Sequence, residues 1–223
     1  MKTKLRILSA LVVFLAVGCV LLSAFLIKAV KNPEENGGKI KVTSPLPAGD
    51  GSEDIQFKLS LLHLYYESKD VVSTLPFTTI QVTQGALIKA FMTGPSAAED
   101  AEAYLNRYAD RTLNSAFDTM DEIIAKYQSL LTKYNISSSS SYTAKFNKLN
   151  SMFASLKNSS KELISRARTL IKMSKSADYD SYYTNYIEQL SDLTGKIEAN
   201  CSVIMAEYDS LLSSISRDYN IIS

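Results

Sequence analysis

The chain has 223 residues, a formal net charge of +1, one histidine, two cysteines and no tryptophan. With 46% hydrophobic and 21% charged residues it can bury a core, which excludes wholesale disorder. So few histidines and cysteines exclude a four-cysteine zinc site and any site that needs several imidazoles. The low glycine and proline content favours helix.

An uncharged apolar run at residues 7–27 is long enough to cross a bilayer as a helix, which takes about 20 residues. A cleaved signal peptide has a shorter apolar region, of about 7–15 residues, followed by a small-x-small site. The candidate site here begins with the bulky Leu22. We therefore predict a cytoplasmic tail and transmembrane anchor over residues 1–31, with a cleaved signal as the alternative.

Cys19 ends a segment similar to a lipobox, but Ala16 stands where a larger aliphatic residue is usual. We interpret Cys19 as a small apolar residue within the anchor. Basic residues flank the anchor on both sides, and positive charge is retained on the cytoplasmic side. Because a very short N-terminal tail is usually kept inside, we expect a single-pass protein of the cell membrane whose body is extracytoplasmic.

Residues 32–53 are rich in glycine, proline and polar side chains, and we predict a flexible linker there. Residues 1–41 hold seven basic and two acidic side chains, which leaves 17 basic and 21 acidic ones in the rest of the chain. A nucleic-acid-binding domain is usually basic as a whole, so we expect no nucleic acid as a partner. We therefore do not expect the predicted body, residues 54–223, to be a general nucleic-acid-binding domain.

The first predicted helical region, residues 54–92, has a broad apolar face that Pro76 interrupts. Residues 78–83 are rich in threonine and β-branched side chains, which are poor helix formers. We expect either one kinked helix or two shorter helices, and residues 78–83 fit an extended segment as well.

A second helix is predicted from Ser96 to about Tyr134, because Ser96 and Glu99 fit a capping box after Gly94 and Pro95. Its expected seam consists of Leu113, Phe117, Met120, Ile124, Tyr127, Leu131 and Tyr134.

A serine-rich turn at residues 135–141 separates this helix from a third, and a second turn before Asp178 introduces a fourth. The third seam is Tyr142, Phe146, Leu149, Phe153, Leu156, Ser160, Leu163, Ala167, Leu170 and Ser174. The fourth is Tyr183, Ile187, Leu190, Thr194, Ile197, Cys201, Ile204, Tyr208, Leu211, Ile215, Asp218 and Ile222. Alternating three- and four-residue spacing with short turns predicts an all-α, antiparallel, up-down four-helix bundle.

The charges of the predicted helices are complementary. Residues 142–175 carry eight basic and one acidic side chain, whereas residues 96–125 and 178–223 are both acidic. We expect the basic third helix to lie between two acidic neighbours, with charge pairs that select partner and register more than they stabilise.

No pattern of reactive residues indicates an enzyme, a cofactor or a metal. His63 has no nucleophile or carboxylate partner nearby in the sequence, and we expect it on a helix surface. Cys201 is expected to be a buried small apolar residue, with an intermolecular disulfide as the alternative. The cluster Asp118, Asp121 and Glu122 is expected to be a solvated acidic face, since a di-metal bundle site would need Glu-x-x-His pairs.

The end of the bundle remote from the linker is the predicted contact surface for a partner protein. Tyrosines spaced i, i+3, i+4 and i+7 open the fourth helix, and a basic row ends the third. Tyrosine is favoured in interface cores, although core packing and a solvated basic face are the alternatives. The predicted partner-binding residues are Tyr179, Tyr182, Tyr186, Arg168, Lys172 and Lys175.

These expectations favour a membrane-anchored, non-enzymatic interaction or scaffold protein of the cell envelope. Its predicted partners are the lipid bilayer, through residues 7–27, and an unidentified protein, and a homo-oligomer stays open. The alternative is an accessory ligand-binding or sensory subunit that pairs with a separate receptor or transporter. A cavity lined by the small core residues Ser160, Ala167 and Thr194 would favour that alternative.

Overall fold

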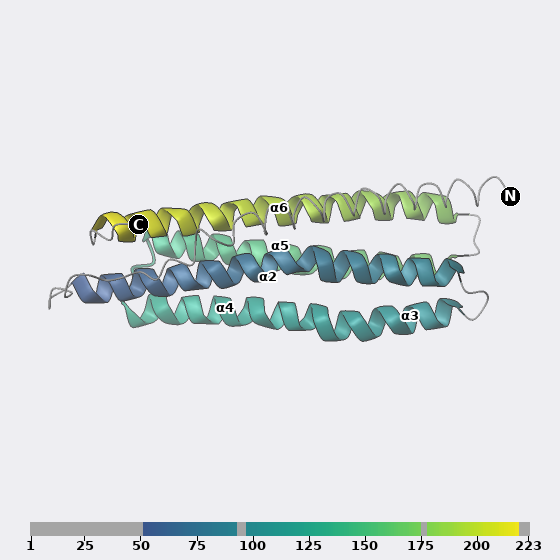
Figure 1. The fold of residues 1–223 in the computed structure, drawn as a ribbon, viewed down its shortest axis with the longest axis horizontal. Helices are drawn as coiled ribbons and strands as arrows, with labels where there is room; N and C mark the ends of the chain where they lie inside the picture. The colour runs from purple at the N-terminus through teal and green to yellow at the C-terminus, as the bar shows by residue number, and fades with distance from the viewer. Residues whose placement is uncertain (1–50, 93–96, 175–177, 219–223) are drawn as a thin grey trace, which may run out of the picture. The chain divides into compact units, whose positions relative to one another are not determined.

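A computed structural model describes residues 51–92, 97–174 and 178–218, and all of its regular structure in those ranges is helical. The elements are α2 (Gly51–Met92), α3 (Ala97–Tyr108), the π-helical turn η1 (Ala109–Leu113), α4 (Asn114–Lys133), α5 (Ser141–Lys172) and α6 (Tyr179–Asp218). Because α3, η1 and α4 follow one another without a break, they form one long rod beside three others (Figure 1). The prediction of an all-α body of about four long helices is confirmed.

Within the described part of the chain, no helix combines the length and the hydropathy that a membrane crossing requires. The predicted anchor, residues 7–27, lies outside the described residues, as does Lys175. The helices belong to one compact unit, Leu46–Ile222. Helix α2 begins at Gly51, so the last three residues of the predicted linker are helical.

Helix α2 packs against every other helix of the unit, and α5 also contacts α3, α4 and α6. Lys58, near the start of α2, lies 3.1 Å from Asp218 at the end of α6. Thr83, in the second half of α2, is hydrogen-bonded to Tyr186 near the start of α6. The two helices are therefore antiparallel. In the same way, Lys126 of α4 contacts α2 near its start, and Tyr104 of α3 contacts it near its end.

Helix α2 runs continuously through Pro76, so neither an extended segment nor a division into two helices forms at residues 78–83. Proline has no N–H to donate to the carbonyl four residues earlier. The Thr78 hydroxyl donates to carbonyls one turn earlier, at 3.2–3.3 Å, and the Thr83 hydroxyl does the same at 2.8–3.1 Å. Burial of Leu75 and Val82 adds about 1.5–3 kcal/mol each, which outweighs the low helix propensity of threonine.

The π-helical turn η1 changes the direction in which the buried residues of the rod α3–η1–α4 point, relative to an uninterrupted α-helix. Five buried residues in this rod recur at every fourth position, and each such step drifts by about 40° around an ideal α-helix. A π-helical turn is wider and removes this drift, so the residues stay on one face. The five are Ala101, Leu105, Ala109, Leu113 and Phe117.

Downstream of η1 the predicted seam is buried except at Ile124 and Tyr134, which are only half-buried. Ile123 is fully buried in place of Ile124. Both Ile123 and Ile124 fit three- and four-residue spacing between Met120 and Tyr127, so the pattern alone does not decide which of the two is buried.

Every predicted seam residue of α5 from Leu149 to Leu170 is buried, and Ile164 and Ile171, which the predicted seam does not include, are buried as well. The Ser140 hydroxyl caps the helix by accepting a hydrogen bond from the Thr143 N–H at 3.1 Å. The predicted residues that are buried are Leu149, Phe153, Leu156, Ser160, Leu163, Ala167 and Leu170.

The first two turns of α6 are rotated relative to the prediction. Tyr179 and Tyr186 are buried there, whereas the predicted Tyr183 and Ile187 are only half-buried. From Leu190 onwards most of the predicted seam is buried, although Thr194, Cys201 and Tyr208 are half-buried and Asp218 is exposed.

The predicted pairing of the basic helix with acidic neighbours is observed. Lys157 of α5 contacts Asp121 of α4 at 2.5 Å. Lys172 contacts Glu102 of α3 at 3.3 Å, and on the other side Lys145 contacts Glu207 of α6 at 2.6 Å. Such exposed pairs contribute about 0–1 kcal/mol each, so they fix which helices are neighbours more than they hold them together.

Replacing Leu156 or Ile204 by alanine should lower the free energy of unfolding by about 2–5 kcal/mol, because both side chains are buried in the middle of a seam. Ser155→Ala, one residue away on the exposed face of α5, is the control and should change it by less than about 0.5 kcal/mol. Chemical denaturation of the full chain in mild detergent, followed by circular dichroism, measures all three. Losses under about 1 kcal/mol at both seam positions would contradict the seams.

Candidate functional site

The structure separates the tyrosines that sequence analysis grouped at the start of α6. Tyr179 and Tyr186 are buried, and the Tyr186 hydroxyl donates to the Thr83 hydroxyl at 2.8 Å. Burial raises the pKa of both phenols. Only Tyr182 is exposed, with 44% of its surface accessible. The assignment of Tyr179 and Tyr186 to a surface is therefore corrected, because both side chains are buried and Tyr186 reaches α2.

The predicted basic residues Arg168 and Lys172 contact α3 and not the tyrosines of α6. Arg168 donates its Nε and Nη2 hydrogens to the side-chain oxygen of Asn106, at 3.0 and 2.8 Å. Lys172 forms the contact with Glu102 described above. Both partners belong to α3, whereas Tyr186 contacts α2. The residues predicted as one contact surface thus lie on different sides of the unit, and their role in binding a partner stays a prediction.

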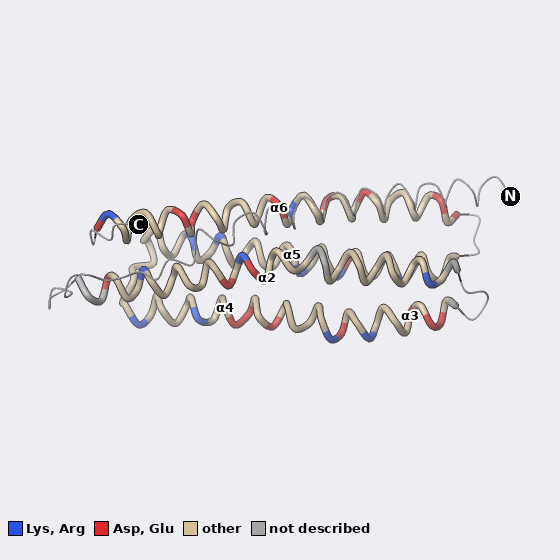
Figure 2. The backbone as a smooth tube through the Cα atoms, in the orientation of Figure 1, with Lys and Arg blue, Asp and Glu red and all other residues tan. Residues whose placement is uncertain are grey.

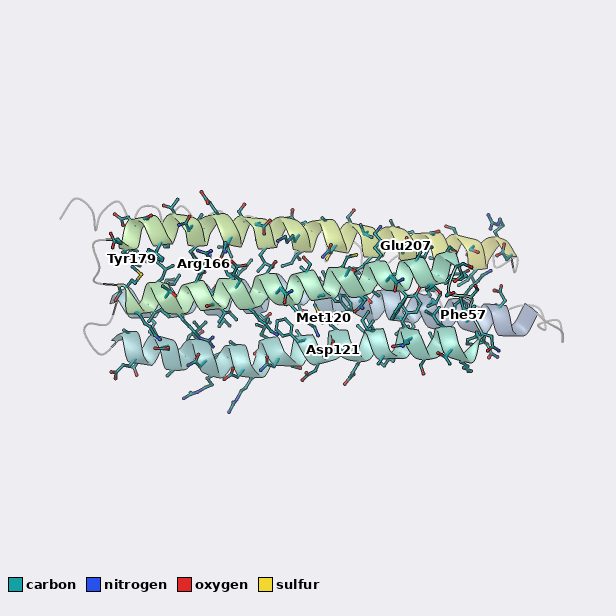
Figure 3. The ribbon with its side chains drawn as sticks, turned by 180° about the vertical axis from the view of Figure 1, so that it is seen from behind. Phe57, Met120, Asp121, Arg166, Tyr179 and Glu207 are labelled. Carbon is teal, nitrogen blue, oxygen red and sulfur yellow. The ribbon has the colours of Figure 1, made fainter. Side chains whose placement is uncertain are left out.

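Tyr182 shares its face of α6 with Gln189, because residues seven apart lie two turns apart on one side of a helix. The Gln189 side-chain amide donates to Glu162 of α5 at 2.7 Å, and Arg166 Nη2 lies 3.4 Å from the same carboxylate oxygen. Figure 3 shows Arg166 between α5 and α6. We call Glu162, Arg166, Tyr182 and Gln189 the α5–α6 seam.

The seam carries two buried polar atoms, Arg166 Nε and Gln189 Oε1, that have no hydrogen-bond partner. A buried group left in this state costs about 1–3 kcal/mol. The α5–α6 seam is therefore a stretch of surface where hydrogen-bonding capacity is not used up within the chain. Sequence analysis missed Arg166 and Gln189, because no spacing pattern shows which polar residues of two helices come opposite each other.

The interior offers little room for a ligand. A cavity between α2, α5 and α6 has a volume of about 10 Å³, which is space for about one water molecule. Its lining residues are Tyr65, Lys145, Lys148, Leu149, Met152, Val203, Ile204 and Glu207. Burial raises the pKa of Tyr65, and it raises the pKa of Tyr127 nearby to about 12, so both phenols stay neutral.

The small core residues predicted to line a ligand cavity are not among those eight. Ser160 and Ala167 are fully buried, and the Thr194 hydroxyl donates to the Leu190 carbonyl of its own helix at 2.9 Å. The hydroxyls of Ser160 and Thr79 are buried without a hydrogen-bond partner. These residues act by their small size, which lets the helices approach closely.

The residues considered for chemistry lie apart from one another. His63 is exposed, as expected, but it contacts Glu67, one turn further along α2, at 3.0 Å, so the expectation that it has no carboxylate partner nearby is corrected. Cys201 is half-buried, and burial raises the pKa of its thiol, although Lys69 nearby lowers it and Glu198 raises it. The acidic cluster of α4 (Asp118, Asp121, Glu122) is exposed, as predicted. Across the described ranges, histidine, cysteine and carboxylate side chains form no group of three that could hold a metal.

No family of proteins, no curated protein and no solved structure matches the chain. The candidate site is therefore the α5–α6 seam as its own geometry defines it.

Removing the Tyr186 hydroxyl with Tyr186→Phe should lower the free energy of unfolding by about 0.5–1.5 kcal/mol, because a buried hydrogen bond to Thr83 is lost. Tyr182→Phe removes the hydroxyl of an exposed tyrosine and should change stability by less than about 0.5 kcal/mol. Chemical denaturation of the full chain compares the two variants. Equal effects would mean that Tyr186 is not a core residue.

Proposed function

We propose that the protein is a membrane-anchored, non-enzymatic interaction protein of the cell envelope. In this proposal residues 7–27 hold the chain in the membrane as a single-pass anchor, and the antiparallel helical bundle outside the cytoplasm binds a partner protein. The observation that carries the proposal is an exposed tyrosine, Tyr182, on the same face of α6 as Gln189, whose Oε1 is buried without a hydrogen-bond partner.

The proposed contact is the α5–α6 seam. Tyrosine and arginine are the side chains that contribute most often to the energy of protein interfaces, because they combine a large apolar area with hydrogen bonding. Tyr182 offers the aromatic ring, and Arg166 and Gln189 offer a donor and an acceptor with no partner within the chain. A partner that contacts Tyr182 would cover this seam and could satisfy both atoms after a small rotation of their side chains.

The alternative of an accessory ligand-binding subunit has less support. Ligand pockets usually have volumes of about 300–1,000 Å³. The cavity between α2, α5 and α6 is far smaller, and the small core residues are packed against their neighbours. Among the described residues, a cavity with room for about one water favours recognition at the surface.

The anchor and the contact can be tested in one preparation. Membranes that contain the full chain are washed with alkaline carbonate, and the protein should stay in the membrane fraction because of its uncharged apolar run. A full-length chain found in the wash would contradict the anchor. Partner proteins are then crosslinked in the washed membranes, purified with the chain and quantified by mass spectrometry.

Tyr182→Ser should reduce the recovery of the specific partner at least tenfold, whereas Tyr108→Ser should leave it unchanged. Tyr108 is the matched control because it is 45% exposed but lies on α3. Thermal unfolding of both variants should stay close to that of the unmodified chain. Equal recovery with both variants would refute the contact at Tyr182 without affecting the anchor.

A further inference from the structure

Two helices expose large apolar side chains at the end of the unit where α2 begins. Leu59 and Tyr66 of α2 are 44% and 57% exposed, and Leu212 of α6 is 37% exposed. Half-buried apolar residues lie on the same helix faces, at spacings of three and four residues. We call this surface the α2–α6 patch, made of Leu59, Leu62, Tyr66, Met205, Tyr208 and Leu212.

The patch is continuous across the two helices. The Tyr66 and Tyr208 rings have their centroids 6.4 Å apart. Lys58 reaches Asp218 at 3.1 Å, so the antiparallel register places Leu62 level with Leu212. The apolar residues of both helices therefore occupy the same height along the unit and form one surface.

Charge is scarce on the α6 side of the patch. Residues 199–216 include only two charged side chains, Glu207 and Asp209, and Glu207 is paired with Lys145 of α5. The first half of α6, from Tyr179 to Glu198, includes five, and Arg217 and Asp218 follow at the end of the helix. Figure 2 shows coloured positions in both halves of α6. An exposed stretch with as little charge as residues 199–216 is typical of a surface that a partner covers.

Lys58, which borders the patch at the start of α2, is neutralised within the chain. Lys58 contacts Asp54 at 2.8 Å as well as Asp218. The hydrogen bond from Lys58, together with those from Ser214 and Arg217, lowers the pKa of Asp218 to about 2. A strongly charged partner would thus find few charges to pair with. The partner that fits is itself apolar, with little charge.

We propose that a second copy of this chain binds the α2–α6 patch. A two-fold axis along the helices would place α2 of one copy against α6 of the other, apolar residue against apolar residue. In that arrangement His63, which is 72% exposed on its side chain, comes within about one turn of Asp209 in the other copy. An imidazole N–H and a carboxylate would face each other there, so the two surfaces are also complementary in hydrogen bonding.

The parallel orientation of the two copies rests on the proposed anchor, because both chains would enter α2 from the same bilayer. Confinement in one membrane raises the effective concentration of the copies and makes a patch of modest size sufficient. The patch lies at the opposite end of α6 from Tyr182, so self-association leaves the α5–α6 seam open to a different protein.

The mass of the full chain in detergent micelles and in lipid nanodiscs, measured by light scattering, tests the proposal. The unmodified chain should be a dimer. The double variant Tyr66→Glu, Leu212→Glu should be a monomer, with its dissociation constant raised at least tenfold. Tyr108→Glu, an equally exposed tyrosine outside the patch, should remain dimeric. If the glutamate variant unfolds, Tyr66→Ser with Leu212→Ser keeps the test, because serine is tolerated on this face.

A monomeric unmodified chain, or a double variant that stays dimeric, would overturn the proposal. Quenching of tyrosine fluorescence by brominated lipid in the unmodified chain but not in Tyr66→Phe would also overturn it, since the patch would then lie on the bilayer. The anchor is judged separately by the carbonate wash. A chain that is washed out yet remains dimeric in solution would refute the anchor and keep the dimer.

Discussion

The burial of α2 by all the other helices is the constraint on which the rest of the structure depends. Helix α2 contains Pro76 in its interior and a run rich in threonine after it, and an interior proline costs about 3 kcal/mol in a helix. Alone, such a segment would not be expected to stay helical over its full length. Its fully buried Leu61, Val72 and Leu75 contribute about 1.5–3 kcal/mol each, so tertiary packing decides its conformation.

The same central position explains why the interior is closed. The neighbours of α2 can approach closely because several core positions hold small residues, among them Ser160 and Ala167 of α5. Gly85 of α2 lies under the Tyr104 ring, and an added Cβ there would come 3.3 Å from the Tyr104 hydroxyl oxygen. Because of this close packing, the cavity between α2, α5 and α6 has room for about one water. Such a cavity is too small for a ligand, and binding at the surface is the remaining candidate.

Sequence periodicity predicts the parts of this fold in which one pattern dominates. The seam of α5 is correct because strict three- and four-residue spacing leaves a single apolar stripe. Periodicity is ambiguous at the start of α6, where tyrosines at i, i+3, i+4 and i+7 fit two stripes. The Tyr186 stripe is the buried one, since its hydroxyl finds Thr83 across the interface. Which tyrosine stripe is buried depends on the register between α2 and α6, and that register cannot be read from the spacing of residues within α6.

The candidate surfaces were less predictable than the core. The α5–α6 seam depends on which polar residues of two helices come together, and the α2–α6 patch depends on which apolar residues remain uncovered. Leu59 and Tyr66 look like core residues in the sequence, because a broad apolar face does not show how much of it neighbouring helices can cover. Only the packing of the other three rods around α2 separates the buried part from the exposed part.

Hydrogen exchange of the full chain tests the central role of this packing most directly. Backbone amides of residues 78–83 should be protected within about tenfold of those in the middle of α5, because their helix is held by the same cooperative core. The amides of Ser137 and Ser138, two exposed residues of the serine-rich turn, are the internal reference for unprotected backbone. Exchange of residues 78–83 as fast as in that turn would contradict a continuous, packing-held α2.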